Sequence, residues 1–219
     1  MIKVNVETYS ISKMGIEILL AHLNESGFIG LSVGHPLTKE DVISEIYHMS
    51  NSHILRFEDG QLMIEEPYKT IVDDIRNANV IMQVEAVAKK RKNKYFYFGQ
   101  RFLACEASNT RKDTVQFFYQ EKNAFVNLLA ENEYLPEKSS PEEQELACEI
   151  GSMQELEPDS IVTKIKVFIH KMEYCDLVIT REGLHDYFYI FENHTCKKYF
   201  YTHALFEKIM DEWMKGVIL

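Results

Sequence analysis

The sequence predicts an α+β fold, in which antiparallel strands form one or more sheets and helices pack on one face and at the ends. Over residues 161–169, apolar and polar residues alternate, which is typical of a strand with one face in solvent. Asp59-Gly60 stands between two apolar runs and indicates a two-residue β-hairpin turn. Predicted strands over 80–120 and over 161–201 are each followed by a predicted helix. This repeated order predicts pseudo-twofold duplicated halves.

The N-terminal segment predicts a strand followed by a helix. Apolar and polar residues alternate from Ile2 to Val6, as in a half-buried strand. Ser12 is a good N-cap for a helix that reaches about Leu23. The glycines in the loop over 24–36 lack the spacing of a phosphate-binding loop, so no nucleotide site is predicted there.

The stretch 35–87 predicts a helix, a hairpin, a second helix and a strand. Thr38 and Asp41 have the spacing of a capping box at the start of the first helix. We expect this helix to bury three side chains: Val42, Ile43 and Ile46. Pro67 suits the first turn of the second helix, and the β-branched residues from Val80 onward favour a strand.

The middle of the chain predicts a hairpin with a basic tip, followed by an acidic connection. The tip KKRKN at 89–93 leads into a strand, KYFYFGQRFLACEA, and TVQFFYQ supplies another. Asn123 is expected to cap the helix AFVNLLAENEYL. A short helix is predicted over 142–150, because Pro141 and Glu142 suit a helix start.

The last third predicts mostly strands. DYFYIF is apolar on both faces, as expected of a central strand. The segments REGLHD and ENHTCK are predicted turns, and Thr202 is expected to cap a final helix. That helix has an apolar stripe of five residues: Leu205, Phe206, Ile209, Met210 and Trp213.

The length of 219 residues is compatible with one α+β domain over 1–219. Within it, we predict halves at 1–134 and 160–219, joined by an acidic connection over 135–159. This connection contains three prolines between 135 and 160, a composition that suits a link between two halves.

The charge distribution argues against a protein devoted to nucleic acid. The net charge is −10, whereas nucleic-acid affinity depends mainly on cations that neutralise phosphates. Eight basic residues and one acidic residue lie between Lys89 and Lys112, and ten acidic residues and one basic residue lie between Glu131 and Asp159. For the basic tip at 89–94, a solvated turn and a contact with nucleic acid, membrane or another partner remain open alternatives.

The sequence also predicts no membrane insertion and a cytoplasmic location. Each apolar run is shorter than the roughly 20 residues of a membrane-spanning helix. The start, MIKVNVETYS, alternates and lacks the apolar centre of a signal peptide.

Residue chemistry predicts neither an enzyme nor a cofactor or metal site. The cysteines are widely spaced and are expected to be free, mostly buried thiols: Cys105, Cys148, Cys175 and Cys196. Four histidines lack a second ligand at metal-binding helical spacing: His22, His35, His48 and His53. Four residues in or beside the C-terminal turns would form a metal site only if they converged in space: His185, Asp186, His194 and Cys196. The paired acids are expected to be solvated: Asp73, Asp74, Glu142 and Glu143. The sequence therefore predicts no catalytic residues, no cofactor-binding residues and no metal ligands.

The aromatic clusters have two interpretations. YFYFGQRF, QFFY, DYFYIF and YFY are most simply core residues of a sheet. YFYFGQRF also follows the basic tip, as in proteins that stack aromatic side chains on RNA bases, but the glycine–aromatic order of an RNA-binding motif is missing. Aromatic surface left uncovered by helices would be a protein-docking face.

Four segments carry a resemblance to a known family. They are VETYSISKMGIEILLAHL, the hairpin L-x-F-x-D-G-x-L-x-I, the segment NANVIMQVEAVAKKRKNKYFYFG, and the C-terminal KIKVFI with CDLVITREGLHDYFYIFENHTCKKYFYTHALFEKIMDEW. In element order and apolar spacing, nearly the whole chain resembles the EspG-like type VII secretion chaperones, particularly their EsaE-like branch in firmicutes.

The resemblance implies an EspG-like fold and a non-enzymatic cytosolic chaperone. Such a chaperone would bind a helical secretion substrate, WXG- or LXG-like, and keep it soluble for export. The family has no fixed substrate-contacting motif to transfer, so the partner-binding residues are left unassigned. The alternative is a winged-helix DNA-binding regulator that uses residues 37–64, although the acidic helix in this stretch is a poor match to a phosphate-lined groove.

Overall fold

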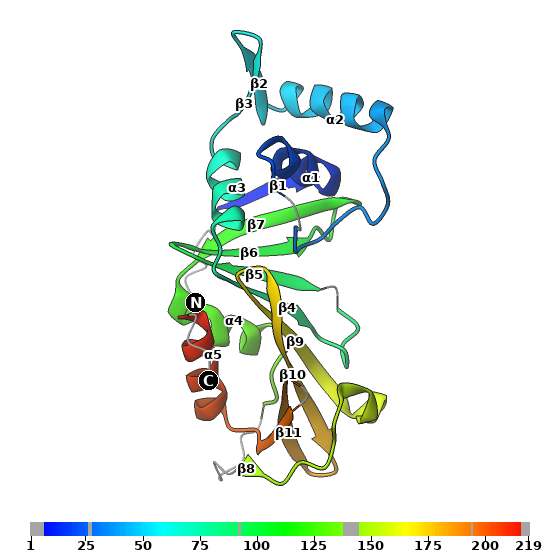
Figure 1. Cartoon of the computed structure of the whole chain (residues 1–219), viewed down its shortest axis with the longest axis vertical. Helices are drawn as coiled ribbons and strands as arrows, with labels where there is room; N and C mark the ends of the chain where they lie inside the picture. The colour runs from blue at the N-terminus through cyan, green and yellow to red at the C-terminus, as the bar shows by residue number, and fades with distance from the viewer. Residues whose placement is uncertain (1–6, 26–27, 92, 138–144, 194, 216–219) are drawn as a thin grey trace. The chain divides into compact units, whose positions relative to one another are not determined.

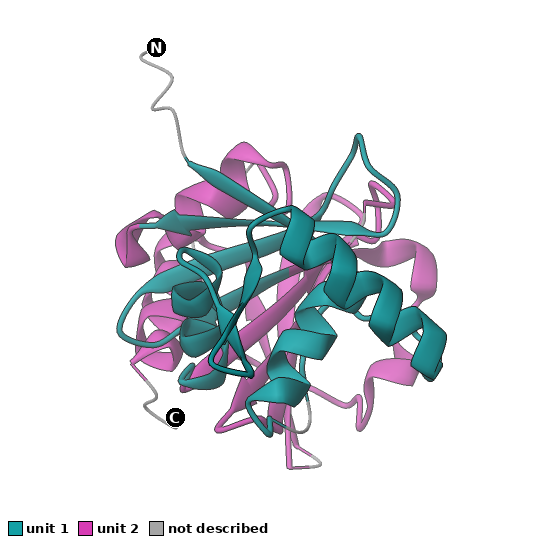
Figure 2. Ribbon diagram, turned by 90° about the horizontal axis from the view of Figure 1, so that it is seen from above, with its two compact units in different colours: residues 1–78, 95–120 teal, residues 79–94, 121–219 magenta. Residues whose placement is uncertain are grey.

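A computed structural model describes residues 7–25, 28–91, 93–137, 145–193 and 195–215. The chain divides into two compact units, which Figure 2 distinguishes by colour. Unit 1 comprises residues 1–78 and 95–120, and unit 2 comprises residues 79–94 and 121–219. Helices accompany antiparallel strand pairs in both units, so the predicted α+β class is confirmed.

Unit 1 contains three helices and two groups of strands (Figure 1). The helices are α1 (Lys13–His22), α2 (Lys39–Asn51) and α3 (Tyr68–Arg76). One group has the order β1-β7-β6-β5, with β1 (Thr8–Ser12), β5 (Lys94–Phe98), β6 (Phe102–Ala107) and β7 (Thr114–Gln120). The other is a separate hairpin of β2 (Leu55–Glu58) and β3 (Gln61–Ile64).

In its described residues, unit 2 contains six strands in the order β4-β9-β10-β11-β12-β8. They are β4 (Val80–Glu85), β8 (Glu145–Leu146), β9 (Ile161–Ile169), β10 (Met172–Glu182), β11 (His185–Glu192) and β12 (Thr195–Phe200). The α-helices are α4 (Phe125–Glu131) and α5 (His203–Met214). Short 3₁₀ turns cover Lys122–Ala124, Met153–Glu155 and Pro158–Ser160.

Local sequence signals account for many of these elements. Ser12, Thr38 and Thr202 each accept a backbone N–H through the side chain at the start of a helix, as predicted. Every second residue of β9 is buried, which confirms its predicted alternation. β11 lies between β10 and β12, and its three central residues are buried in succession: Phe188, Tyr189 and Ile190. It is therefore covered on both faces at its centre.

Four local predictions are wrong. Asn123 lies inside a 3₁₀ turn, and α4 begins after Ala124 without a side-chain cap. The predicted helix over 142–150 is contradicted over 145–150, where β8 pairs with β12 and the rest has no helix. KYFYFGQRFLACEA is two strands, because the chain turns at Gly99, whose N–H donates to the Arg101 carbonyl. Ile43, expected to be buried, is 57% exposed.

Three further predictions concern the N-terminal strand, the division of the chain into halves, and membrane insertion. The strand expected over residues 2–6 lies outside the described residues. The units divide the chain near residues 78, 94 and 120, whereas the sequence suggested halves at 1–134 and 160–219; the described part of the acidic connection lies within unit 2. None of the described helices combines the length and apolarity needed to cross a membrane.

The Glu182 carboxylate is the centre of a polar cluster in unit 2. It accepts hydrogen bonds from Tyr189 Oη at 2.6 Å, Lys198 Nζ at 2.9 Å and Thr180 Oγ1 at 3.0 Å. Lys198 also lies over the Tyr187 ring, with Nζ 4.1 Å from its centroid. Burial alone would raise the pKa of Glu182, but these hydrogen bonds outweigh it and lower the pKa.

This cluster makes stability depend on pH in the acidic range. A carboxyl whose pKa is lower in the folded chain stabilises it above the unfolded pKa, and this contribution is lost as pH falls through the folded value. We expect Glu182→Gln to lower the free energy of unfolding by about 1 kcal/mol at pH 7. Urea unfolding followed by circular dichroism should show a smaller loss for this variant than for wild type between about pH 6 and pH 3. Parallel pH profiles would contradict the prediction.

Candidate functional site

Exposed apolar side chains concentrate on residues 38–64 of unit 1, which we call the helix–hairpin element. They come from α2 and from the β2–β3 hairpin: Ile43, Tyr47, Phe57 and Met63. Tyr47 is 71% exposed and Phe57 is 66% exposed. Across the rest of the described chain, only Met172 and Leu184 are large apolar residues with an exposed side chain. Clustered apolar exposure of this kind marks an interaction surface.

The rotation of α2 explains why part of its apolar surface is exposed. Met49 is fully buried on one side of the helix. On the turn before it, the Glu45 carboxylate accepts a hydrogen bond from Ser12 Oγ, the N-cap of α1. α2 lies beside α1 (Figure 1). It therefore packs on α1 through the side that carries Glu45 and Met49. Ile43 and Tyr47, one turn apart on another side, are left in solvent.

The hairpin adds a second exposed apolar side. Asp59 and Gly60 have φ values of 50° and 78°, and positive φ at both central positions is what a type I′ turn requires. The resulting register places Phe57 opposite Leu62. Opposite residues of an antiparallel pair project from the same face, so these two side chains share one face of the hairpin.

An apolar groove of about 610 Å³ lies between α1, α2 and the hairpin. Its apolar lining includes Ile18, Leu20, Phe28, Val42, Ile46 and Leu62. Because Leu62 lines the groove and Phe57 shares its face, the exposed apolar surface of the hairpin continues the groove wall. The helix–hairpin element thus combines a preformed groove with an apolar rim.

The charge around this groove is negative. Residues 37–66 include seven acidic and two basic residues. One of the basic residues, Arg56, is already paired with two carboxylates, at 2.9 Å from Glu58 and 2.6 Å from Glu65. The other, Lys39, starts α2 beside Glu40 and Asp41. Such a surface favours a partner with basic groups next to an apolar face and disfavours a phosphate backbone.

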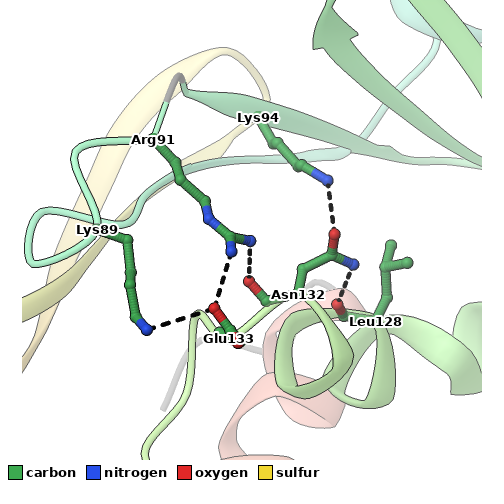
Figure 3. Close-up of polar contacts among 6 residues, drawn as sticks. All are labelled: Lys89, Arg91, Lys94, Leu128, Asn132 and Glu133. Atoms are coloured by element: carbon green, nitrogen blue, oxygen red, sulfur yellow. Dashed lines mark hydrogen bonds and ion pairs between the residues drawn. The ribbon is translucent and has the colours of Figure 1, made fainter. Parts of the chain in front are cut away.

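The basic tip in unit 2 contacts the end of α4 (Figure 3). Arg91 donates to the backbone carbonyl of Asn132, the C-cap of α4, and to the Glu133 carboxylate at 2.8 Å. Lys89 Nζ lies 3.4 Å from the same carboxylate. Lys94 Nζ donates to Asn132 Oδ1 at 3.3 Å. Cations are favourable at a helix C-terminus, so the tip clamps this helix end.

These contacts identify a structural role for the tip that the sequence did not predict. We expect Arg91→Ala to lower the free energy of unfolding by about 1 kcal/mol, because a charge-assisted hydrogen bond and an exposed ion pair are lost. Lys90→Gln is the matched control, because this exposed neighbour keeps a long polar side chain. Chemical denaturation of both variants tests the difference, and equal stabilities would contradict the clamp.

The candidate metal-binding residues that the structure describes lie apart from one another or have other partners. In the described ranges, no three His, Cys, Asp or Glu side chains gather in a metal-binding arrangement. Asp186 pairs with Arg181 at 2.9 Å, and His185 packs on the Phe200 ring. His194, Glu142 and Glu143 lie outside the described residues.

The four histidines of the N-terminal part lie at separate places. His22 lines the groove, the His35 ring contacts the Pro36 carbonyl, and His48 lies 4.0 Å from Glu45. His53 adopts a positive φ of 55° where the chain leaves α2.

The paired acids on α3 differ from each other. Asp73 forms an exposed ion pair with Arg76. The Asp74 side chain is only 12% exposed, and its carboxylate accepts hydrogen bonds from Tyr119 Oη at 2.7 Å and from Arg101 Nε at 3.3 Å. The expectation of a solvated charge is therefore wrong for Asp74, because Tyr119 of β7 and Arg101, just before β6, both bind its carboxylate. Burial and this hydrogen bond raise the pKa of Tyr119.

The aromatic clusters are mainly core. Tyr95, Phe96, Tyr97 and Phe98 of β5 are all buried, and Phe98 stacks on Phe102 with ring centroids 4.7 Å apart. These rings are therefore not available to stack on RNA bases, and the core interpretation is confirmed for β5. The exposed aromatics that do form a surface, Tyr47 and Phe57, lie outside every cluster that the sequence singled out.

Comparison of the sequence with models of known protein families finds no match, and comparison with curated proteins finds none either. The EspG-like resemblance therefore stays a prediction, and the helix–hairpin element is assigned from geometry alone.

Proposed function

We propose that this chain is a non-enzymatic cytoplasmic chaperone or adaptor that binds a helical type VII secretion substrate and keeps it soluble for export. The observation that carries the proposal is the apolar groove continued by the exposed side chains of the helix–hairpin element. The resemblance in element order supports the class of partner, a WXG- or LXG-like helical protein.

An amphipathic helix suits this surface. Helices that bind in grooves present apolar residues at i, i+3, i+4 and i+7 to an apolar lining. Covering one exposed side chain such as Phe57 removes apolar area from water, which is worth about 1.5–3 kcal/mol when the side chain is fully buried. The same contact covers the apolar face of the partner. That masking accounts for the solubility that a secretion substrate needs before export.

The charge around the groove indicates which residues flank the apolar face of the partner helix. The acidic surroundings of the groove favour a helix with Lys or Arg beside its apolar face. A winged-helix regulator would have to place the same acidic residues against phosphate, so no observation favours that alternative.

Co-expression with a WXG- or LXG-like helical protein tests the proposal. We expect a soluble 1:1 complex in size-exclusion chromatography, and tighter binding of a Lys-flanked amphipathic helical peptide than of the same peptide with Glu flanks. Elution of the chain alone with every such partner would contradict the proposal. Tight, sequence-selective, salt-sensitive DNA binding in a gel-shift assay would support the regulator instead.

A further inference from the structure

Two cysteines, Cys148 and Cys196, pack against one apolar cluster beside the edge strands of unit 2. β8 pairs with β12 in antiparallel register, with Leu146 opposite Lys198 and Glu145 opposite Tyr199. Continuing this register by two residues places Cys148 opposite Cys196. Burial, and then the neighbouring Cys148 side chain, raise the pKa of Cys196, as expected of two thiols that lie near each other.

Burial supports this arrangement. From Glu145 to Ile150, exposed and half-buried residues alternate strictly, as along an extended chain with one face inward. Cys148 and Cys196 both pack against the same apolar cluster, which is built around Leu156, Ile161, Val178 and Tyr189. The two thiols therefore share one face of the sheet edge.

The geometry suits a disulfide. Opposite residues of an antiparallel pair have Cα atoms about 4.5–5.5 Å apart. A disulfide needs Cα atoms about 4.4–6.8 Å apart. The other two cysteines differ, because Cys105 and Cys175 are buried. Cys148 and Cys196 are both partly exposed, so an oxidant in solution reaches them first.

We propose that Cys148 and Cys196 form a reversible disulfide under oxidation by a peroxide, which pins the acidic segment 145–150 to the edge strand β12. Cytoplasmic disulfides are typically transient and redox-sensing, so this site is compatible with the location proposed above. The proposal does not depend on the identity of the partner.

The two thiols and one peroxide molecule give the disulfide and two water molecules. The Cys148 thiolate attacks one peroxide oxygen, the O–O bond breaks, and a sulfenic acid forms while hydroxide takes up the thiol proton as water. The Cys196 sulfur then attacks the Cys148 sulfur, the S–O bond breaks, and the departing hydroxide takes the Cys196 proton and leaves as the second water. Burial and the neighbouring Cys148 side chain raise the pKa of Cys196 to about 12, which slows this second step.

Mass mapping of the full chain tests the proposal. The protein is treated with hydrogen peroxide, its remaining thiols are alkylated, and it is digested without reduction. We expect a peptide that joins Cys148 to Cys196 within one chain, its disappearance after dithiothreitol, and alkylated Cys105 and Cys175. We also expect the midpoint of thermal unfolding to rise by roughly 5 °C or more on oxidation, because the bond closes a long loop.

Cys148→Ser and Cys196→Ser are the matched variants, and each should lose both the linked peptide and the thermal shift. If either variant fails to fold, the mapping of the wild-type chain still decides. Alkylated Cys148 and Cys196 after peroxide treatment that oxidises a free cysteine peptide would overturn the proposal. Linkage to Cys105 or Cys175, or to a second copy of the chain on a non-reducing gel, would overturn it equally.

Discussion

Phe57→Glu is expected to weaken binding of the helical partner by at least about 30-fold, because a buried aromatic anchor at an interface is worth about 2 kcal/mol or more. The substitution places a carboxylate on the hairpin face that Phe57 shares with Leu62, next to the groove. A partner that covers this face would have to desolvate the new charge. Isothermal titration calorimetry with the co-purified helical partner measures the change.

Stability is expected to stay constant in this variant. Phe57 is 66% exposed, and substitutions at exposed positions usually change the free energy of unfolding by less than about 0.5 kcal/mol. Leu184→Glu is the matched control, because Leu184 is 99% exposed at the β10–β11 turn of unit 2. It should bind the partner as wild type does. Equal affinity of all three proteins would exclude the helix–hairpin element as the docking surface.

Ile43→Glu tests the α2 side of the same surface. Because the Ile43 side chain is exposed, its replacement should leave the fold intact. We expect this variant to lose affinity for the helical partner to an extent similar to Phe57→Glu. A loss in Phe57→Glu without a loss in Ile43→Glu would restrict the docking surface to the hairpin.

Trp213→Ala is expected to lower the free energy of unfolding by about 3–5 kcal/mol, because it leaves a large cavity in the core of unit 2. Trp213 is the single tryptophan of the chain and is 1% exposed on α5. Its ring meets Tyr174 of β10 edge-on, with centroids 6.5 Å apart. Since small domains are stable by only about 5–15 kcal/mol, this loss is a large fraction of the total.

Two further variants separate the cavity from other effects. Trp213→Phe keeps most of the ring volume, and the indole N–H has no hydrogen-bond partner among the described residues, so its loss costs little. Met214→Ala, at the half-exposed neighbouring position, should cost less than either core change. Urea unfolding followed by circular dichroism ranks all four proteins, since fluorescence reports only those that keep Trp213. A loss below about 1 kcal/mol in Trp213→Ala would show that α5 is not a core helix.

Much of the fold could be predicted from short-range signals. The capping box at Thr38, the Asp59-Gly60 turn and the alternation along β9 each depend on residues close in sequence, and all three are confirmed. The errors also come from relying on short-range signals, where a distant partner decides the structure. Pro141 and Glu142 suit a helix start, but Glu145 and Leu146 pair with β12, a partner about fifty residues away that no local pattern reveals.

The candidate site was harder to predict than the fold. The apolar residues of α2 span more than one side of the helix, so periodicity alone did not determine which of them are covered. The contact of Glu45 with Ser12 and the burial of Met49 determine the rotation of the helix, and both involve α1 or other distant residues. Ile43 was therefore predicted to be buried and is exposed.

The sequence by itself determined the α+β class, the starts of three helices and the hairpin turn, because these depend on backbone hydrogen bonding and side-chain period within a few residues. Only the tertiary structure decided which apolar side chains stay in solvent, that the basic tip clamps α4, and that Cys148 and Cys196 pack against one apolar cluster. The physical reason is that exposure and pairing depend on which distant surfaces meet, and that is set by packing rather than by local propensity.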